Sequence, residues 1–138
     1  MITLILGKKG SGKTKRLIDM CNDATETSIG NVVFIEKGST LTFDLNHKTR
    51  LAVAEEYGID CFDSLYGFIA GMCAGNYDIT NIFVDQTLKI GGSDMDAFEA
   101  FIQKLAQLGQ RTDAKMVLSI SADKADIPAG IHDYVTEM

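Results

Sequence analysis

The sequence predicts an α/β fold with three layers, in which helices cover both faces of a mainly parallel sheet. Short apolar runs that suit buried strands alternate along the chain with segments whose apolar residues recur at helical spacing. Strands that alternate with helices favour parallel pairing, and a parallel sheet needs a helical cover on each face. The length of 138 residues is usual for one domain, so we expect residues 1–138 to form a single domain.

The expected strands are short and mostly apolar, at residues 2–6, 31–35, 50–53, 81–85, 115–120 and near 134–135. The first two are almost entirely apolar, which is typical of strands that are buried on both faces. Residues 41–43 are expected to add a further short strand, joined to 50–53 as a hairpin by a polar turn.

Three segments have the periodicity of amphipathic helices, at about 13–24, 61–74 and 94–108. Ser93 is the expected N-cap of the last one. In the second helix, Gly67, Gly71 and Gly75 recur every four residues. Because glycine destabilises a helix, we expect these three to allow close backbone contact on one face.

Composition excludes several classes of protein. The net charge is −6, and the one expected basic cluster lies in and beside a single loop, so the charge disfavours nucleic-acid binding. No apolar run approaches the ~18 residues of a membrane span, and residues 1–6 make a poor signal peptide, so a cytoplasmic location is expected. Cys21, Cys61 and Cys73 form no C-x-x-C pair, so neither a zinc site nor a redox pair is indicated.

A glycine-rich loop follows the first expected strand and matches the pattern G-x-x-x-x-G-K-[ST] at every position. Its residues are Gly7, Lys8, Lys9, Gly10, Ser11, Gly12, Lys13 and Thr14. Glycines let backbone N–H groups approach phosphate oxygens, and the N-terminus of the next helix carries a partial positive charge. Lys13 is expected to reach the outer phosphates and the Thr14 hydroxyl to contact magnesium. The loop therefore predicts a bound nucleoside triphosphate with Mg²⁺, and ATP is the nucleotide we expect.

On these residues the sequence resembles the P-loop NTPase superfamily, and the strand–helix alternation extends the resemblance over most of the chain. The apolar strand 82–85, which ends in Asp85, is similar to the Walker B segment of that family. The resemblance implies a P-loop NTPase fold, with Asp85 holding Mg²⁺ directly or through water. Base specificity stays open, because no aromatic residue stands out as a stacking group.

Within the superfamily the chain resembles the RecA-like branch, in which an inserted strand separates the P-loop strand from the Walker B strand. Many members carry a glutamate directly after the Walker B aspartate, where this chain has Gln86, which can orient water but cannot take its proton. Others place the catalytic glutamate at the end of the second strand, where Glu36 stands. Lys13, Glu36 and Gln86 are thus the catalytic candidates, and a solvated strand-end charge is the alternative for Glu36. Ser119 and Ser121 lie where the family often has a polar residue that senses the γ-phosphate.

Resemblance also implies partners. RecA-like domains often complete their site with an arginine from a neighbouring subunit, so a homo-oligomer or protein partner is one expectation, with Arg50 as the candidate arginine. The chain also resembles small stand-alone proteins labelled twitching motility ATPase (PilT-like). The pilus-retraction motors behind that label resemble a longer protein with histidine-rich boxes, which His47 and His132 do not form. The segment 89–94 is a candidate for moving with the nucleotide state.

Several functions stay open. The first is a weak or partner-activated ATPase, and the second is a nucleotide-dependent switch or assembly subunit without hydrolysis, which Gln86 favours. A small nucleoside or nucleotide kinase is a third, although such enzymes clamp phosphates with several arginines and this chain has only three. A GTPase would need an N-K-x-D motif, and residues 123–126 have aspartate where asparagine belongs.

Overall fold

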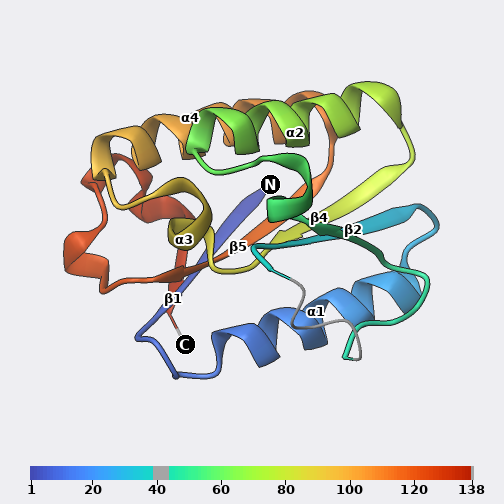
Figure 1. Cartoon of the computed structure of the whole chain (residues 1–138), viewed down its shortest axis with the longest axis horizontal. Helices are drawn as coiled ribbons and strands as arrows, with labels where there is room; N and C mark the ends of the chain where they lie inside the picture. The colour runs from blue at the N-terminus through green and yellow to red at the C-terminus, as the bar shows by residue number, and fades with distance from the viewer. Residues whose placement is uncertain (39–43, 138) are drawn as a thin grey trace.

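The structure is a computed structural model that describes residues 1–38 and 44–137. Within this part of the chain, six strands form one parallel sheet in the order β3-β2-β4-β5-β1-β6 (Figure 1). The strands are β1 (Ile2–Gly7), β2 (Asn31–Glu36), β3 (Arg50–Val53), β4 (Ile79–Val84), β5 (Lys115–Ser121) and β6 (Val135–Glu137). β5 therefore lies between β1 and β4, although it follows both of them in the sequence.

Helices cover both faces of the sheet (Figure 1). α1 (Lys13–Thr27) lies on one face, whereas α2 (Phe62–Gly75) and α4 (Met95–Thr112) lie side by side on the other. A short helix, α3 (Thr87–Gly91), follows β4, and 3-10 turns occur at Ala54–Tyr57, Lys124–Asp126 and Ala129–Tyr134. The predicted three-layer α/β fold is confirmed. Among the described residues, no helix combines the length and the apolar character that crossing a membrane requires.

Alternating side chains of each strand build two separate cores. In β1, Leu4 and Leu6 pack into the core beneath α2 and α4, whereas Ile5 packs with Leu17 and Cys21 of α1. Each of these apolar side chains is almost completely buried, and such burial stabilises the fold by roughly 1.5–3 kcal/mol per side chain. This two-sided burial explains why the strands read as continuous apolar runs.

Residues 50–53 form the predicted strand, β3, which pairs in parallel with β2 at the edge of the sheet, and the hairpin predicted with residues 41–43 falls outside the described residues. One local prediction was wrong. The N-cap of α4 is Asp94 rather than Ser93, because the Asp94 carboxylate accepts hydrogen bonds from the backbone N–H groups of Asp96 and Ala97 at 3.0 and 3.2 Å. A carboxylate is the stronger acceptor beside the positive end of a helix.

The glycine prediction for α2 was also wrong. A Cβ atom added at Gly67, Gly71 or Gly75 would meet no other atom within 4 Å. The three glycines lie on the exposed face of the helix, while its buried face is formed by apolar residues such as Leu65 and Ile69. Close backbone contact within the chain therefore does not explain them.

Candidate functional site

Three segments of the chain meet at the carboxyl edge of the sheet. β1 ends at Gly7, which pairs with Ser121 of β5, and the glycine-rich loop (residues 7–14) begins there. β4, on the other side of β5, ends at Val84 and is followed directly by Asp85. In parallel sheets, ligands commonly bind beyond the carboxyl ends of the strands. The strand order therefore brings the loop and Asp85 to the same place.

The loop leads into α1 through two residues with left-handed backbone conformation, Gly10 (φ 83°) and Gly12 (φ 92°). Glycine adopts this conformation without steric cost. Gly12 is the N-cap of α1, and no side chain in the described part of the chain caps this helix. The first turn also contains no acidic residue. Its backbone N–H groups are therefore left for another acceptor, and an anion is the natural one.

Lys13 is buried, with 7 % of its surface exposed, although it lies at the start of α1. Its ammonium group donates hydrogen bonds to the Lys8 carbonyl oxygen at 2.7 Å and to Ser11 Oγ at 3.4 Å. Burial lowers the pKa of Lys13, and the nearby Asp85 carboxylate opposes that shift. The loop thus folds around its own lysine, which places one cation directly among the loop's backbone groups.

Asp85 is the centre of a hydrogen-bond network, and only 1 % of its surface is exposed. The Thr14 hydroxyl lies 3.0 and 3.2 Å from its two carboxylate oxygens, and the Ser119 hydroxyl donates to Oδ1 at 2.7 Å. Ser119 Oγ also accepts a hydrogen bond from the Gln86 backbone N–H at 2.9 Å. Asp85 therefore links α1, β4 and β5 at one point.

A pocket of about 330 Å³ lies over this network. It is lined by five residues of the glycine-rich loop, by residues 85, 86 and 89, and by the two serines of β5. Three of the lining residues are lysines, Lys9, Lys13 and Lys89, and one is a carboxylate, Asp85. The pocket lining therefore has an excess of two positive charges in a chain whose net charge is −6. Such a pocket suits a polyanion.

The oxygen atoms of Thr14 and Asp85 are the kind of ligand that Mg²⁺ prefers. They already approach within hydrogen-bond distance of each other, so a small hard cation could be bound by both. Within residues 1–38 and 44–137, no cluster of three or more His, Cys, Asp or Glu side chains could hold a metal ion by itself. Mg²⁺ in nucleotide sites is usually held by one or two protein ligands together with phosphates, and the residues here fit that arrangement.

The other candidate residues lie apart from the pocket. Glu36 ends β2 next to Asp85, whose backbone N–H bonds to the Ile35 carbonyl oxygen at 2.9 Å, yet Glu36 is not among the lining residues. It is 2 % exposed, so it is not a solvated strand-end charge. Arg50 begins β3 at the amino edge of the sheet, away from the pocket, and contacts the Tyr57 hydroxyl at 3.4 Å.

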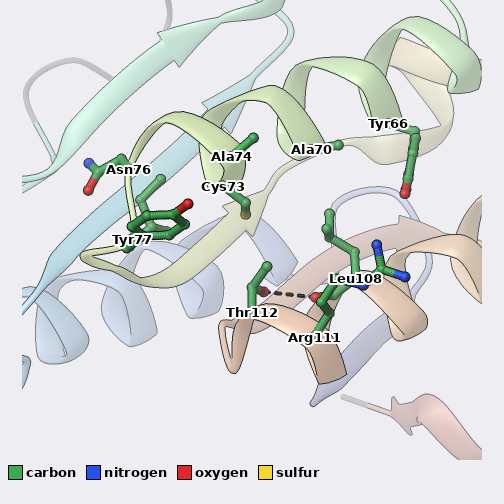
Figure 2. Close-up of a pocket in the computed structure, with 10 residues that line it drawn as sticks. Tyr66, Ala70, Cys73, Ala74, Asn76, Tyr77, Leu108, Arg111 and Thr112 are labelled. Atoms are coloured by element: carbon green, nitrogen blue, oxygen red, sulfur yellow. Dashed lines mark hydrogen bonds between the residues drawn. The ribbon is translucent and has the colours of Figure 1, made fainter.

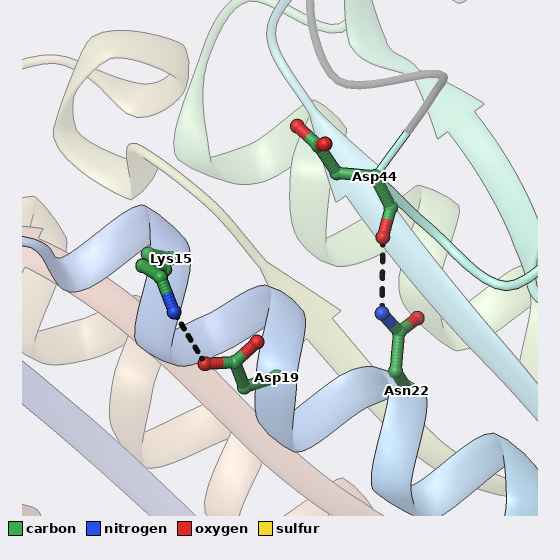
Figure 3. Close-up of polar contacts among 4 residues, drawn as sticks. All are labelled: Lys15, Asp19, Asn22 and Asp44. Atoms are coloured by element: carbon green, nitrogen blue, oxygen red, sulfur yellow. Dashed lines mark hydrogen bonds and ion pairs between the residues drawn. The ribbon is translucent and has the colours of Figure 1, made fainter.

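Lys15 points along α1 rather than into the pocket. Its ammonium group forms an ion pair with Asp19 at 3.2 Å, one helical turn further on (Figure 3). The same view shows Asn22 donating a hydrogen bond to the Asp44 carbonyl oxygen, which holds the segment before β3 against α1 (Figure 3). The basic cluster read from the sequence is therefore divided, and only part of it faces the pocket.

A second pocket, of about 480 Å³, lies between the C-terminal parts of α2 and α4. Cys73, Leu108 and Tyr77 are among its lining residues, with Arg111 at α4 (Figure 2). Among the described residues, it shares none with the pocket over Asp85, and it is lined by one basic side chain rather than three. Its chemistry does not suit a polyphosphate.

Sequence reasoning missed two features of the pocket. Gln86 adopts a left-handed backbone conformation (φ 52°, ψ 49°), which no pattern in the sequence predicts. Lys89 lines the pocket from α3, a five-residue helix that was not among the three predicted helices. The spacing could have indicated Lys89, because it follows Asp85 by four residues, which is about one helical turn and would place both residues on the same side of a helix.

Comparison with known proteins adds no assignment: no protein-family model matches the chain, and no curated protein is significantly similar to it.

Proposed function

We propose that the chain is a nucleotide-binding P-loop protein that holds a nucleoside triphosphate with Mg²⁺ in the pocket between the glycine-rich loop and α3. The observation that carries the proposal is the meeting of the loop, the Thr14–Asp85 pair and three lysines around one pocket. The position of β5 between β1 and β4 adds support, since it is the strand order of the RecA-like branch that the sequence resembles.

In this proposal each residue has a separate role. Backbone N–H groups of residues 10–14 hold the β-phosphate, and Lys13 neutralises the β- and γ-phosphates. Thr14 and Asp85 hold Mg²⁺, which would neutralise charge on the phosphate oxygens. The hydrogen bond from Ser119 keeps the Asp85 carboxylate in a fixed orientation before any ligand arrives. Such preorganisation lowers the cost of binding.

ATP is the nucleotide we propose, and a weak or partner-activated ATPase is the activity. Glu36 and Gln86 are the residues that would position or activate water. Gln86 lines the pocket, whereas Glu36 lies beside Asp85 but outside the lining. Glu36 would need a conformational change to reach the γ-phosphate. Otherwise a partner would have to supply a group that acts in its place. This geometry favours slow hydrolysis by the isolated chain.

A nucleotide-dependent switch or assembly subunit is the second candidate. The observation that favours it is that, among the described residues, Asp85 is the one carboxylate that lines the pocket, and it already bonds with Thr14 and Ser119. A carboxylate committed to a metal ion is a poor general base. The chain would then bind ATP and release it largely intact.

Binding is tested by thermal unfolding of the full chain with Mg-ATP, Mg-ADP and Mg-GTP. A ligand at about 100 times its dissociation constant stabilises the folded state by about 2.7 kcal/mol, which for a chain of 138 residues raises Tm by about 9 °C. The rise should disappear in Lys13→Ala and persist in Lys124→Ala, since Lys124 is exposed and outside the pocket. No rise with any nucleotide would overturn the proposal.

Hydrolysis is tested separately by release of inorganic phosphate from Mg-ATP. Loss of release in Glu36→Gln, with nucleotide binding retained, would assign Glu36 as the base. Loss in Gln86→Ala alone would assign water positioning to Gln86. Binding without any phosphate release by the unchanged protein would favour the switch over the ATPase.

A further inference from the structure

The helix α3 is fixed to the body of the protein on both sides of Lys89. Thr87 is fully buried and Ile90 is 2 % exposed, so both anchor the helix in the core. Gly91 packs so closely on the Phe62 ring of α2 that a Cβ atom there would overlap it. These contacts leave little freedom for the backbone that carries Lys89, although Lys89 itself is exposed.

The chain enters α3 through a hydrogen-bonded connection with the site. The Gln86 N–H donates to Ser119 Oγ, and the Lys89 N–H donates to the Gln86 carbonyl oxygen at 3.0 Å. Ser119 in turn donates to Asp85. The backbone position of Lys89 is therefore set by the same network that orients the expected magnesium ligand.

Among residues 1–38 and 44–137, no carboxylate lies within ion-pair distance of the Lys89 ammonium group. Lys13, by contrast, is held by the loop through the Lys8 carbonyl oxygen. Lys89 is therefore a long, flexible cation at a pocket that already suits a polyanion, and it is not committed to another group.

We propose that Lys89 binds the terminal phosphate of the nucleotide and makes the pocket prefer a triphosphate to a diphosphate. This inference rests on the proposed nucleotide binding. The loop holds the β-phosphate at the start of α1, so the γ-phosphate extends away from the loop, past Asp85 toward α3. A diphosphate has no group that reaches this side of the pocket.

Lys89 also supplies inside one chain the cation that an arginine of a neighbouring subunit would otherwise provide. Arg50, the candidate for such an arginine, lies at the amino edge of the sheet, whereas the pocket lies at the carboxyl edge. Recognition of the terminal phosphate then needs no second subunit.

The test is calorimetric titration of the full chain with Mg-ADP and with the magnesium complex of the β,γ-imido analogue of ATP, which is not hydrolysed. Lys89→Ala should lose about tenfold in affinity for the triphosphate analogue, since a charge-assisted contact to phosphate is removed. Its affinity for Mg-ADP should change less than twofold. Lys89→Arg should keep most of the preference, and Lys124→Ala, which removes another exposed lysine, should bind like the unchanged protein.

The outcomes separate the two proposals. Equal loss of affinity for both nucleotides would reduce Lys89 to a general electrostatic effect and overturn this inference. So would unchanged affinity for both, while loss of binding in Lys13→Ala would still support the proposed function. Failure of the unchanged protein to bind either nucleotide would overturn both.

Discussion

The Ser119 hydroxyl donates a 2.7 Å hydrogen bond to Oδ1 of Asp85, and both side chains are 1 % exposed. The same hydroxyl accepts from the Gln86 N–H at 2.9 Å, so it uses its donor and one of its two acceptor lone pairs at the same time. Ser119 thereby orients the carboxylate and fixes the backbone that leaves β4. A buried carboxylate held in this way loses little conformational freedom when it binds a cation.

Replacing Ser119 should therefore weaken both folding and magnesium-dependent binding. In Ser119→Ala, the Asp85 carboxylate and the Gln86 N–H each lose a buried partner, and the free energy of unfolding should fall by about 1–3 kcal/mol. Urea unfolding measures this change.

Ser121→Ala is the matched control, because Ser121 lines the same pocket from the same strand but is exposed. Its change should stay within about 0.5 kcal/mol, and an equal loss in the two variants would contradict the role given to Ser119.

The conformation of Gln86 leads to a prediction of the opposite sign. Gln86 has φ 52°, a left-handed conformation that costs a non-glycine residue about 1 kcal/mol or more. Gln86→Gly should therefore raise the free energy of unfolding by about 1 kcal/mol. Gln107→Gly, at an exposed position inside α4, should lower it by about the same amount. Destabilisation of both variants would show that the Gln86 side chain makes a stabilising contact that outweighs the strain.

Burial of Cys21 predicts how stability changes in alkaline solution. Burial raises the pKa of the Cys21 thiol from 9.0 to about 11, against the opposing effect of hydrogen bonds with Thr49 and Thr25. Between these two pH values the folded protein binds more protons than the unfolded chain, so the free energy of unfolding falls as pH rises. Below pH 9 the Cys21 thiol is protonated in both states, and its contribution to the free energy of unfolding is fully present. Cys21→Ala should show a shallower fall over this window in urea unfolding, although its stability at neutral pH will be lower.

The control for that experiment is Ile18→Val, which removes one methyl group from the buried face of α1 and no titratable group. The pH dependence of Ile18→Val should follow that of the unchanged protein, at a lower overall stability. Parallel curves for Cys21→Ala and the unchanged protein would contradict the prediction.

Local features of the sequence were enough to predict the strands and the loop. The two-sided burial of Ile5 and Leu6 in β1 is visible as an apolar run, and the left-handed turns at Gly10 and Gly12 follow from a pattern of fixed spacing. These features depend on residues close together in the chain, so a pattern can report them.

Features that depend on contacts across the chain could not be predicted in the same way. The hydrogen bond between Asp85 and Ser119 joins residues 34 positions apart and exists because β5 is inserted beside β4. The burial of Glu36 depends on contacts distant in the sequence, because Glu36 pairs with Val53 of β3. Lys89 reaches the pocket only because α3 packs against α2, a contact that periodicity does not encode.

Two glycine positions test whether packing or helix propensity decides the cost of a methyl group. Gly91→Ala places a Cβ atom into the Phe62 ring, and the required shift should lower the free energy of unfolding by about 1–3 kcal/mol. Gly71→Ala places a Cβ atom into open space in the middle of α2. Replacing this glycine should raise the free energy of unfolding by about 0.5–1 kcal/mol. Chemical unfolding of the two variants beside the unchanged protein measures both effects.

Because α3 carries Lys89, Gly91→Ala should also weaken binding of the imido analogue more than binding of Mg-ADP. A stabilised Gly91→Ala variant with unchanged nucleotide preference would show that α3 is not held in place by its contact with Phe62.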